Sequence, residues 1–168
     1  NHQSNWDFPS IYYALYRANV APPFIAAGLN MNFFPVGPII RRCGGFFLRR
    51  SFQDDELYKE VFKEYINFLI SHKFNLEFYF EGGRSRTGKL LPPKYGMLSW
   101  IYQSYSNSSP YPVAFLPIAI NYEQIMEGAL YARELAGEKK EKESWLSFLK
   151  SVKVLRRRYG SIQLRCSE

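Results

Sequence analysis

The side chains best suited to chemistry lie at the start of the chain, where His2 is followed five positions later by Asp7. Near neutral pH, an imidazole is the usual group that takes a proton from a hydroxyl. A carboxylate on its other ring nitrogen fixes the tautomer and stabilises the imidazolium. Five residues span about 140° around a regular helix, so the two meet only if His2 lies in a turn before a helix and Asp7 near its start. The alternative, a capping Asp7 and a surface His2, stays open at this spacing alone.

A second group of polar side chains lies at residues 81–89, directly after an apolar stretch that we expect to form a strand. Arg84, Arg86 and Lys89 stand there among glycines and hydroxyls, which is typical of an anion-binding loop at the end of a strand. The segment also fits the G-x-x-x-x-G-K pattern of a nucleotide phosphate loop. That pattern requires Ser or Thr next and then a helix, but Leu90 and two prolines follow. The sequence therefore argues against a nucleotide site.

Two further blocks have features of a binding site. Residues 41–50 place arginine pairs on both sides of a Gly-Gly-aromatic segment, where guanidinium forks suit phosphate and glycines allow close approach. A solvated basic face is the alternative. Because neighbouring side chains of a strand point to opposite sides, one of Arg49 and Arg50 can be structural. Residues 113–121 form an apolar run that fits an ordinary core strand, except that Pro117 marks an edge or a bulge.

Helical and strand patterns alternate along the chain, which predicts an α/β fold with a mostly parallel central sheet flanked by helices. No repeat or linker is present, so residues 1–168 form one domain. We expect a helix that residues 7–9 open and that runs through 10–18, and further helices at 54–70, 95–105 and 138–158. Strands are expected at 24–27, 46–49, 75–80, 113–121 and 161–166. The apolar face of the helix at 54–70 is predicted to consist of Leu57, Val61, Phe62, Tyr65, Phe68 and Leu69.

The composition of the chain limits the kinds of partner that it is expected to bind. The net charge of +7 favours an anionic partner such as a phosphate ester, a coenzyme, an anionic membrane or a nucleic acid. Cys43 and Cys166 lack the spacing of a metal site and fit a reducing compartment. Residues 20–40 are apolar but broken by prolines and glycines, so they predict buried strand and loop, or a surface that dips into the lipid interface. The absence of an initiator Met suggests a piece of a longer protein.

Taken in order, four blocks resemble the glycerol-3-phosphate acyltransferase family, in its membrane-bound bacterial and mitochondrial type, with dihydroxyacetone-phosphate acyltransferases as close kin. The family's N-H-x-S-x-x-D motif matches residues 1–7, and G-x-F-F-I-R-R matches residues 44–50 with Leu48 for Ile. F-x-E-G-x-R-S-R-x-G-K resembles the segment from Phe78 to Lys89, in which Phe80 directly precedes Glu81 and Phe78 is a further aromatic residue. An apolar strand with a central proline and a nearby tyrosine matches Pro117 and Tyr122. The resemblance covers nearly the whole chain.

The resemblance implies a role for each block and a glycerolipid acyltransferase-like fold. The general base would be His2, oriented by Asp7, with no covalent acyl-enzyme, no metal and no cofactor beyond the acyl thioester. The remaining residues divide into cations for the substrate phosphate (Arg49, Arg84 and Arg86, with Arg50 and Lys89 less secure), the acceptor-site motif (Glu81, Gly82 and Ser85) and the acyl-donor side (Pro117).

The reaction implied by the resemblance moves a fatty acyl group from acyl-CoA or acyl carrier protein to the sn-1 hydroxyl of glycerol 3-phosphate, giving lysophosphatidate in phospholipid biosynthesis. Dihydroxyacetone phosphate and a lysophospholipid remain alternative acceptors. A basic nucleic-acid-binding module would explain the charge but not the ordered blocks, so no nucleic-acid partner is expected. We expect association with a membrane surface, facing the cytoplasm.

Overall fold

The computed structural model describes residues 2–49, 55–108, 111–137 and 159–167. Along the chain the elements are α1 (Asp7–Arg17), β1 (Phe24–Gly28), the 3-10 helix η1 (Leu29–Met31), α2 (Val36–Arg42), β2 (Gly45–Leu48), α3 (Glu56–Ser71), β3 (Leu76–Glu77), α4 (Gly96–Ser108), β4 (Ile118–Tyr122), α5 (Gly128–Leu135) and β5 (Ile162–Cys166). Arg50 and the helix predicted over residues 138–158 lie outside the described residues.

The central sheet has the strand order β2-β1-β3, and both strand pairs are parallel. Ile25 of β1 stands opposite Gly45 of β2 on one side and Glu77 of β3 on the other. Parallel neighbours require a crossover, which α2 provides between β1 and β2 and α3 provides between β2 and β3. Strands β4 and β5 form a separate antiparallel pair. This arrangement confirms the predicted α/β fold with a mostly parallel central sheet flanked by helices.

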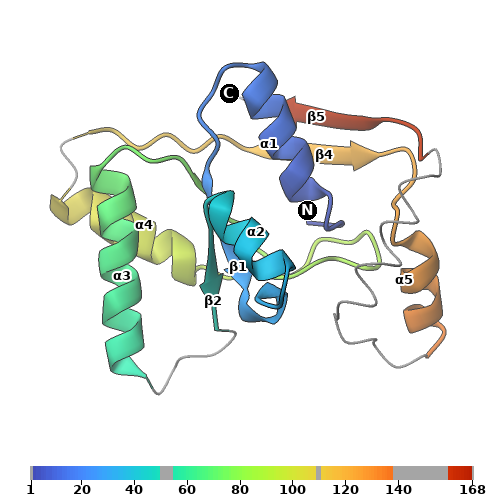
Figure 1. Ribbon diagram of the computed structural model, residues 1–168, viewed down its shortest axis with the longest axis horizontal. Helices are drawn as coiled ribbons and strands as arrows, with labels where there is room; N and C mark the ends of the chain where they lie inside the picture. The colour runs from blue at the N-terminus through green and yellow to red at the C-terminus, as the bar shows by residue number, and fades with distance from the viewer. Residues whose placement is uncertain (1, 50–54, 109–110, 138–158, 168) are drawn as a thin grey trace.

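The main apolar core lies between the central sheet and helices α3 and α4. Phe62, Ile66 and Ile70 of α3 are buried together with Ile101 of α4. Strand side chains complete the cluster, and these include Phe46, Leu48 and Leu76. In Figure 1, α3 and α4 lie to the left of this sheet, whereas α1 and the β4–β5 pair lie to its right. The right-hand side of the molecule therefore carries the segments that surround His2 and Asp7.

The apolar face predicted for α3 was partly wrong. Phe62 and Leu69 are buried as expected, but Leu57 is 76% exposed and Val61 is 61% exposed. At 100° per residue, Leu57, Val61 and Phe68 form a stripe of their own, turned away from the stripe that contains Ile66. The sheet and α4 cover only one of the two stripes.

Two helices were not predicted from the sequence. Helix α2 lies within the stretch expected to be strand and loop, and it starts directly after Pro35 with Pro38 at its third position. Proline is tolerated there because the first turn of a helix has no intrahelical partner for its N–H groups. Helix α5 is short, and Tyr131 is its buried residue.

Two predicted strands are shorter than expected. The strand predicted at 75–80 pairs only at Leu76–Glu77. The strand predicted at 113–121 pairs only from Ile118 onward. Pro117 directly precedes this pairing, as expected for a proline at the edge of a strand, and its carbonyl accepts a bond from the Ser167 N–H at 3.2 Å.

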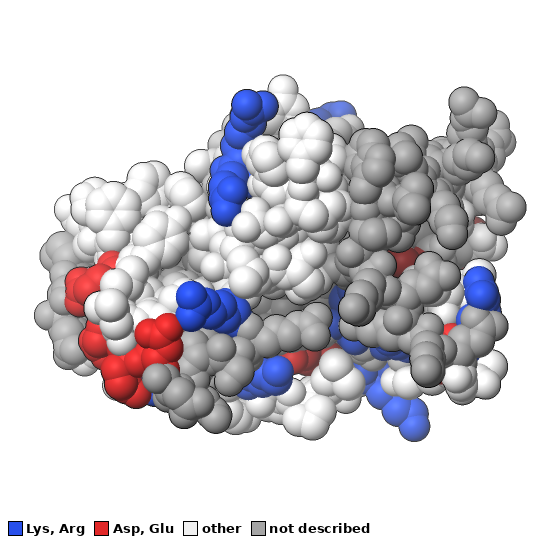
Figure 2. All heavy atoms as spheres, turned by 60° about the horizontal axis from the view of Figure 1, so that its bottom comes forward, with Lys and Arg blue, Asp and Glu red and all other residues white. Residues whose placement is uncertain are grey.

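Charged side chains are distributed unevenly over the surface. Figure 2 shows acidic side chains gathered at the end of the molecule where α3 begins, next to a wide area of described residues without Lys, Arg, Asp or Glu. Several charges of α3 are balanced locally, since Lys59 pairs with Glu56 and Lys63 pairs with Glu60. The net charge of +7 therefore does not come from a uniformly basic surface.

Candidate active site

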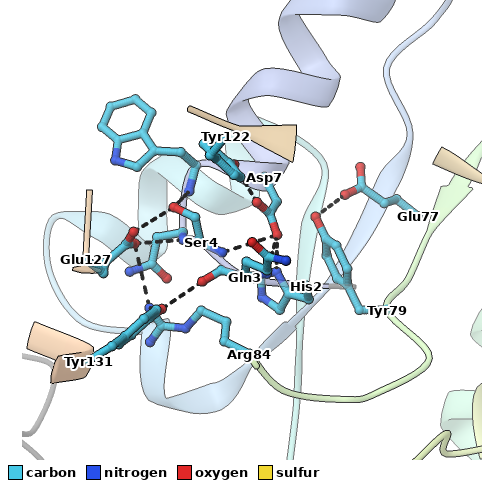
Figure 3. Close-up of polar contacts among 12 residues, drawn as sticks. His2, Gln3, Ser4, Asp7, Glu77, Tyr79, Arg84, Tyr122, Glu127 and Tyr131 are labelled. Carbon is cyan, nitrogen blue, oxygen red and sulfur yellow. Dashed lines mark hydrogen bonds and ion pairs between the residues drawn. The ribbon is translucent and has the colours of Figure 1, made fainter. Parts of the chain in front are cut away.

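His2 and Asp7 meet at the start of α1 (Figure 3). Asp7 is the first residue of the helix, Trp6 is its N-cap, and His2 lies in the irregular segment before the turn that leads into it. The His2 Nδ1 atom lies 2.6 Å from Asp7 Oδ2. This is the geometry that the five-residue spacing requires for the two side chains to meet, so the simple capping alternative does not describe the pair.

Asp7 is completely buried and has several hydrogen-bond donors. Its Oδ2 atom accepts from the main-chain N–H groups of Gln3 at 2.9 Å and Ser4 at 3.3 Å. Its Oδ1 atom accepts from the Tyr122 hydroxyl. Burial alone would raise the pKa of Asp7, but the hydrogen bonds from His2, Tyr122 and Gln3 outweigh it and lower the pKa. The carboxyl group is therefore ionised near neutral pH.

An ionised Asp7 determines the proton distribution on His2. A carboxylate can only accept, so His2 Nδ1–H donates to it and the neutral ring carries its lone pair on Nε2. The His2 side chain is 19% exposed, whereas Asp7 is fully enclosed. The pair can therefore take up a proton at Nε2 and stabilise the resulting imidazolium through Asp7.

Two side chains beside His2 were not singled out by the sequence. The Tyr79 ring stacks on the His2 ring, with centroids 4.1 Å apart and planes 23° apart. The Tyr79 hydroxyl donates to Glu77 Oε1 at 2.7 Å. Burial raises the pKa of Glu77 to about 7, although the Tyr79 hydrogen bond acts against this. The available signal was their two-residue spacing, which places both side chains on one side of an extended chain.

The cationic loop is attached to His2 through Ser85. The Ser85 N–H donates to the His2 carbonyl at 2.7 Å, and the buried Ser85 hydroxyl bonds the Lys89 carbonyl. Residues 85 and 2 thus form one hydrogen-bonded unit although they are far apart in sequence. The loop that carries Arg84 and Arg86 therefore lies against the main chain of His2.

Each of the two loop arginines pairs with a carboxylate near α5. Arg84 NH1 lies 3.8 Å from Glu127 Oε1 and donates to the Tyr131 hydroxyl at 3.4 Å. Arg86 NH1 pairs with Glu134 Oε2, and its guanidinium lies 6.0 Å from the centroid of the Tyr131 ring. These partners are Glu127, Tyr131 and Glu134. They lie on one side of α5, because residues three and four positions apart share a helix face.

Two of these three partners, Glu127 and Tyr131, also bind the His2 segment (Figure 3). Glu127 accepts from the Ser4 hydroxyl at 2.7 Å and from the Asn5 N–H at 2.9 Å. The Tyr131 hydroxyl donates to the Gln3 carbonyl at 2.8 Å. Helix α5 therefore links the loop of the cations to the segment of the base. Sequence reasoning missed this link because α5 was not predicted.

Glu81 and Gly82 shape the turn that follows Phe80. The Glu81 carboxylate accepts from the Leu91 N–H at 3.0 Å, which joins the two ends of the loop. Gly82 has a φ of +59°, a left-handed conformation that favours glycine, and its N–H bonds the Tyr79 carbonyl at 2.9 Å. Both residues thus have contacts that shape the loop, and their predicted place in the acceptor site stays a prediction.

Arg49 and Pro117 have their contacts in other parts of the fold. Arg49 NH1 pairs with Asp55 Oδ2 at 2.9 Å, and its guanidinium lies 4.7 Å from the centroid of the Tyr58 ring. These partners belong to the start of α3. Pro117 is exposed before β4, whose last residue, Tyr122, reaches Asp7. The predicted roles of Arg49 on the phosphate and of Pro117 on the donor side stay predictions.

The fold and the site define a class of α/β protein in which a histidine–aspartate pair, with a lone pair on Nε2, lies beside a loop that carries two arginines. Comparison with known families agrees with this class. Residues 1–121 match the acyltransferase family, and residues 131–168 match the family described as glycerol-3-phosphate acyltransferase C-terminal region. The chain belongs to the acyltransferase family, and the resemblance drawn from the four sequence blocks is confirmed.

One relative indicates how much of a whole protein this chain represents. A protein of Aeromonas hydrophila named glycerol-3-phosphate acyltransferase is 46% identical to the chain over 159 residues. These residues are 95% of this chain and 20% of the relative, so the chain spans about one fifth of that protein's length.

Proposed function

We propose that the protein containing this chain transfers a fatty acyl group from a thioester to the sn-1 hydroxyl of glycerol 3-phosphate, with lysophosphatidate as the product, in phospholipid biosynthesis. The main support is the hydrogen bond of 2.7 Å between the Ser85 N–H and the His2 carbonyl. It attaches an arginine loop to a histidine base. Glycerol 3-phosphate has both complementary groups, a hydroxyl to be activated and a phosphate monoester to be bound.

The proposed reaction uses the lone pair on His2 Nε2. As the acceptor oxygen attacks the thioester carbonyl, Nε2 takes the hydroxyl proton and Asp7 stabilises the imidazolium. The new C–O bond forms, the C–S bond breaks, and the imidazolium returns the proton to the leaving thiolate. No acyl-enzyme is required, because the acceptor oxygen itself attacks the donor. The chain ends each cycle with His2 neutral.

In this proposal the acceptor's phosphate is bound by Arg84 and Arg86, with Arg49 as a third cation. Guanidinium groups bind phosphate oxygens through paired, charge-assisted hydrogen bonds. Each loop arginine already has a carboxylate partner, Glu127 or Glu134, which holds its side chain beside the His2 segment. A phosphate dianion competes well with a single carboxylate for such a fork. Pro117 is assigned to the acyl-donor side.

An acyl-transfer assay on the full-length protein tests this function. Glycerol 3-phosphate, dihydroxyacetone phosphate and a lysophospholipid are compared as acceptors, each with acyl-CoA and with acyl carrier protein as donor. We expect the highest kcat/KM with glycerol 3-phosphate and product acylated at sn-1, with His2→Ala as the inactive control. A preference for the lysophospholipid would overturn the proposed acceptor, and equal rates for wild type and His2→Ala would overturn the mechanism.

We also propose that the protein works at a membrane surface facing the cytoplasm. Among the described residues, no helix combines the length and apolar character needed to cross a bilayer. Around η1 and α2, however, Phe34 is 82% exposed, and Leu29 and Ile39 are exposed as well. Exposed apolar side chains on a basic chain suit the anionic lipids of a cytoplasmic leaflet.

Flotation of the full-length protein with anionic liposomes tests the membrane surface. The double variant Phe33→Ser/Phe34→Ser should float less than wild type. Leu57→Ser/Val61→Ser removes exposed apolar side chains from α3 and is the matched control, which should float like wild type. Equal flotation of the phenylalanine variant and wild type would remove this segment from the membrane contact.

A further inference from the structure

His2 is held by three contacts, two to its ring and one to its main chain. Its Nδ1 atom is bonded to Asp7, and its main-chain carbonyl accepts from the Ser85 N–H. The third contact is with Tyr79, whose ring covers one face of the imidazole at a centroid distance of 4.1 Å. The first two contacts set the position of one ring nitrogen and of the backbone. They leave the ring free to swing about the bond to Asp7, and such swinging moves Nε2.

Tyr79 is itself tied to the central sheet through Glu77. Glu77 is the last residue of β3 and stands opposite Ile25 of β1 in the parallel register. Its Oε1 atom accepts the Tyr79 hydroxyl at 2.7 Å, and no described hydrogen-bond partner reaches the buried Oε2 atom. Burial raises the pKa of the Tyr79 hydroxyl, so the group keeps its proton and remains a donor. A line of contacts thus runs from the sheet through two side chains to the imidazole.

We propose that Tyr79, held by Glu77, is a positioning residue that fixes the plane of the His2 ring and thereby the direction of Nε2. This inference rests on the proposed role of His2 as the base. A ring stacked at 23° allows sliding but opposes rotation out of the plane. Proton transfer depends on the alignment of the base with the reacting hydroxyl, and a misplacement of about 1 Å can cost roughly 10²-fold in rate.

Kinetics of the full-length protein test the positioning role. Tyr79→Leu removes the stack and should lower kcat roughly 10- to 100-fold, with both substrate KM values changed by less than about threefold. Tyr79→Phe keeps the stack and loses the hydroxyl, so its loss of kcat should be smaller, about 3- to 10-fold. Glu77→Gln keeps an acceptor for the hydroxyl and should retain most of the activity.

Phe80→Leu is the matched control, because Phe80 is an exposed aromatic residue next in the chain that contacts Phe78. It should leave kcat nearly unchanged. If Tyr79→Leu behaves like Phe80→Leu, or raises only the KM values, the positioning role is wrong. If Tyr79→Leu lowers the melting temperature strongly, Tyr79→Phe tests the positioning role instead, since it preserves the volume of the ring. A wild-type kcat in Tyr79→Phe would contradict the anchoring of Tyr79 by Glu77.

A second background separates this inference from the function on which it rests. In a His2→Ala protein there is no ring to position, so adding Tyr79→Leu should lower the residual rate no further. An equal loss of rate in both backgrounds would mean that Tyr79 acts elsewhere, even with the proposed function intact. A His2→Ala protein with wild-type activity would instead contradict the proposed function itself.

Discussion

The base and the cations of the candidate site are built in different ways. His2 and Asp7 are five residues apart, and two of the donors to Asp7 are the main-chain N–H groups of residues between them. Arg84 and Arg86 depend on partners far along the chain, since Arg84 and Tyr131 are 47 residues apart. The first arrangement is built mostly by the segment at the start of α1, with the Tyr122 hydroxyl as the distant donor to Asp7. The second exists only when α5 is docked.

Because of this difference, we expect substitutions at His2 or Asp7 to have other effects than substitutions at Arg84 or Arg86. The His2 side is buried at Asp7, and the hydrogen bonds to Asp7 Oδ2 come from residues within five positions along the chain, so a change there should act on the rate of the chemical step. The arginine side contains ion pairs between elements, so a change there should act on acceptor affinity and on the docking of α5. Four sets of variants can break or sharpen this contrast.

The largest expected effect comes from His2→Ala. Loss of a general base typically costs about 10²- to 10⁴-fold in rate, and His2 lies outside the apolar core, so stability should change little. Asp7→Asn should lower the rate as well, and it should also lower the melting temperature, because the amide cannot accept from all the donors that surround the carboxylate. Turnover and thermal unfolding of both full-length variants provide the measurement. Retention of more than about a tenth of wild-type turnover by His2→Ala would refute the base.

Next in size are the effects of Arg84→Ala and Arg86→Ala on the acceptor. A charged hydrogen bond contributes roughly 1.5–3 kcal/mol, so each change should raise the glycerol 3-phosphate KM by about one to two decades. The acyl-donor KM should barely change. Lysine at either position should rescue poorly, since it keeps the charge and loses the fork. Initial rates over a matrix of both substrates test this, and unchanged acceptor KM values in both variants would place the phosphate elsewhere.

The contrast also explains how much of the site could be predicted from the sequence. The meeting of His2 and Asp7 requires only that His2 precede a helix and Asp7 lie near its start, so the spacing permitted it, and the resemblance to the family favoured it over the capping alternative. The partners of the arginines, Glu127 and Glu134, could not be foreseen. They lie on and beside a short helix that the pattern did not indicate, and a carboxylate in a polar segment has no spacing that reveals a distant arginine.

Prediction of the fold from the sequence was limited in the same way. Parallel β1 and β2 and the long helix α3 follow from alternating patterns, and they were predicted nearly at their observed bounds. The buried side of α3 was predicted less well, since the predicted face included Val61 and left out Ile66. Apolar residues occur on two stripes of this helix, and only packing against α4 and the sheet selects the stripe that is buried. Tyr79 was read only as part of a motif, since its stacking on His2 arises from tertiary contact.

A smaller effect, on the pH dependence of stability, tests the buried His2 side. Burial raises the pKa of Glu77 from 4.5 to about 7. Between these two pKa values the folded state binds more protons than the unfolded state. The stability that Glu77 contributes is therefore fully present below the unfolded pKa and is lost as the pH rises through the folded pKa. Glu77→Gln cannot ionise, so its melting temperature should fall less than that of wild type between about pH 5 and about pH 8. The exposed Glu64→Gln on α3 is the control and should follow wild type.

The smallest effect should come from the ion pair between Arg86 and Glu134, and it distinguishes a phosphate-binding arginine from a purely structural one. The arginine is 27% exposed and the glutamate 10%, so solvent screens the pair in part and its coupling should be only about 1 kcal/mol. A double-mutant cycle with Arg86→Ala and Glu134→Ala on thermal stability measures this coupling. The same four proteins then give acceptor KM values. If Arg86 binds phosphate, Arg86→Ala raises KM whether or not Glu134 is present. If Arg86 only braces α5, its effect on KM disappears in the Glu134→Ala background, and the arginine side of the site would then be structural at this position.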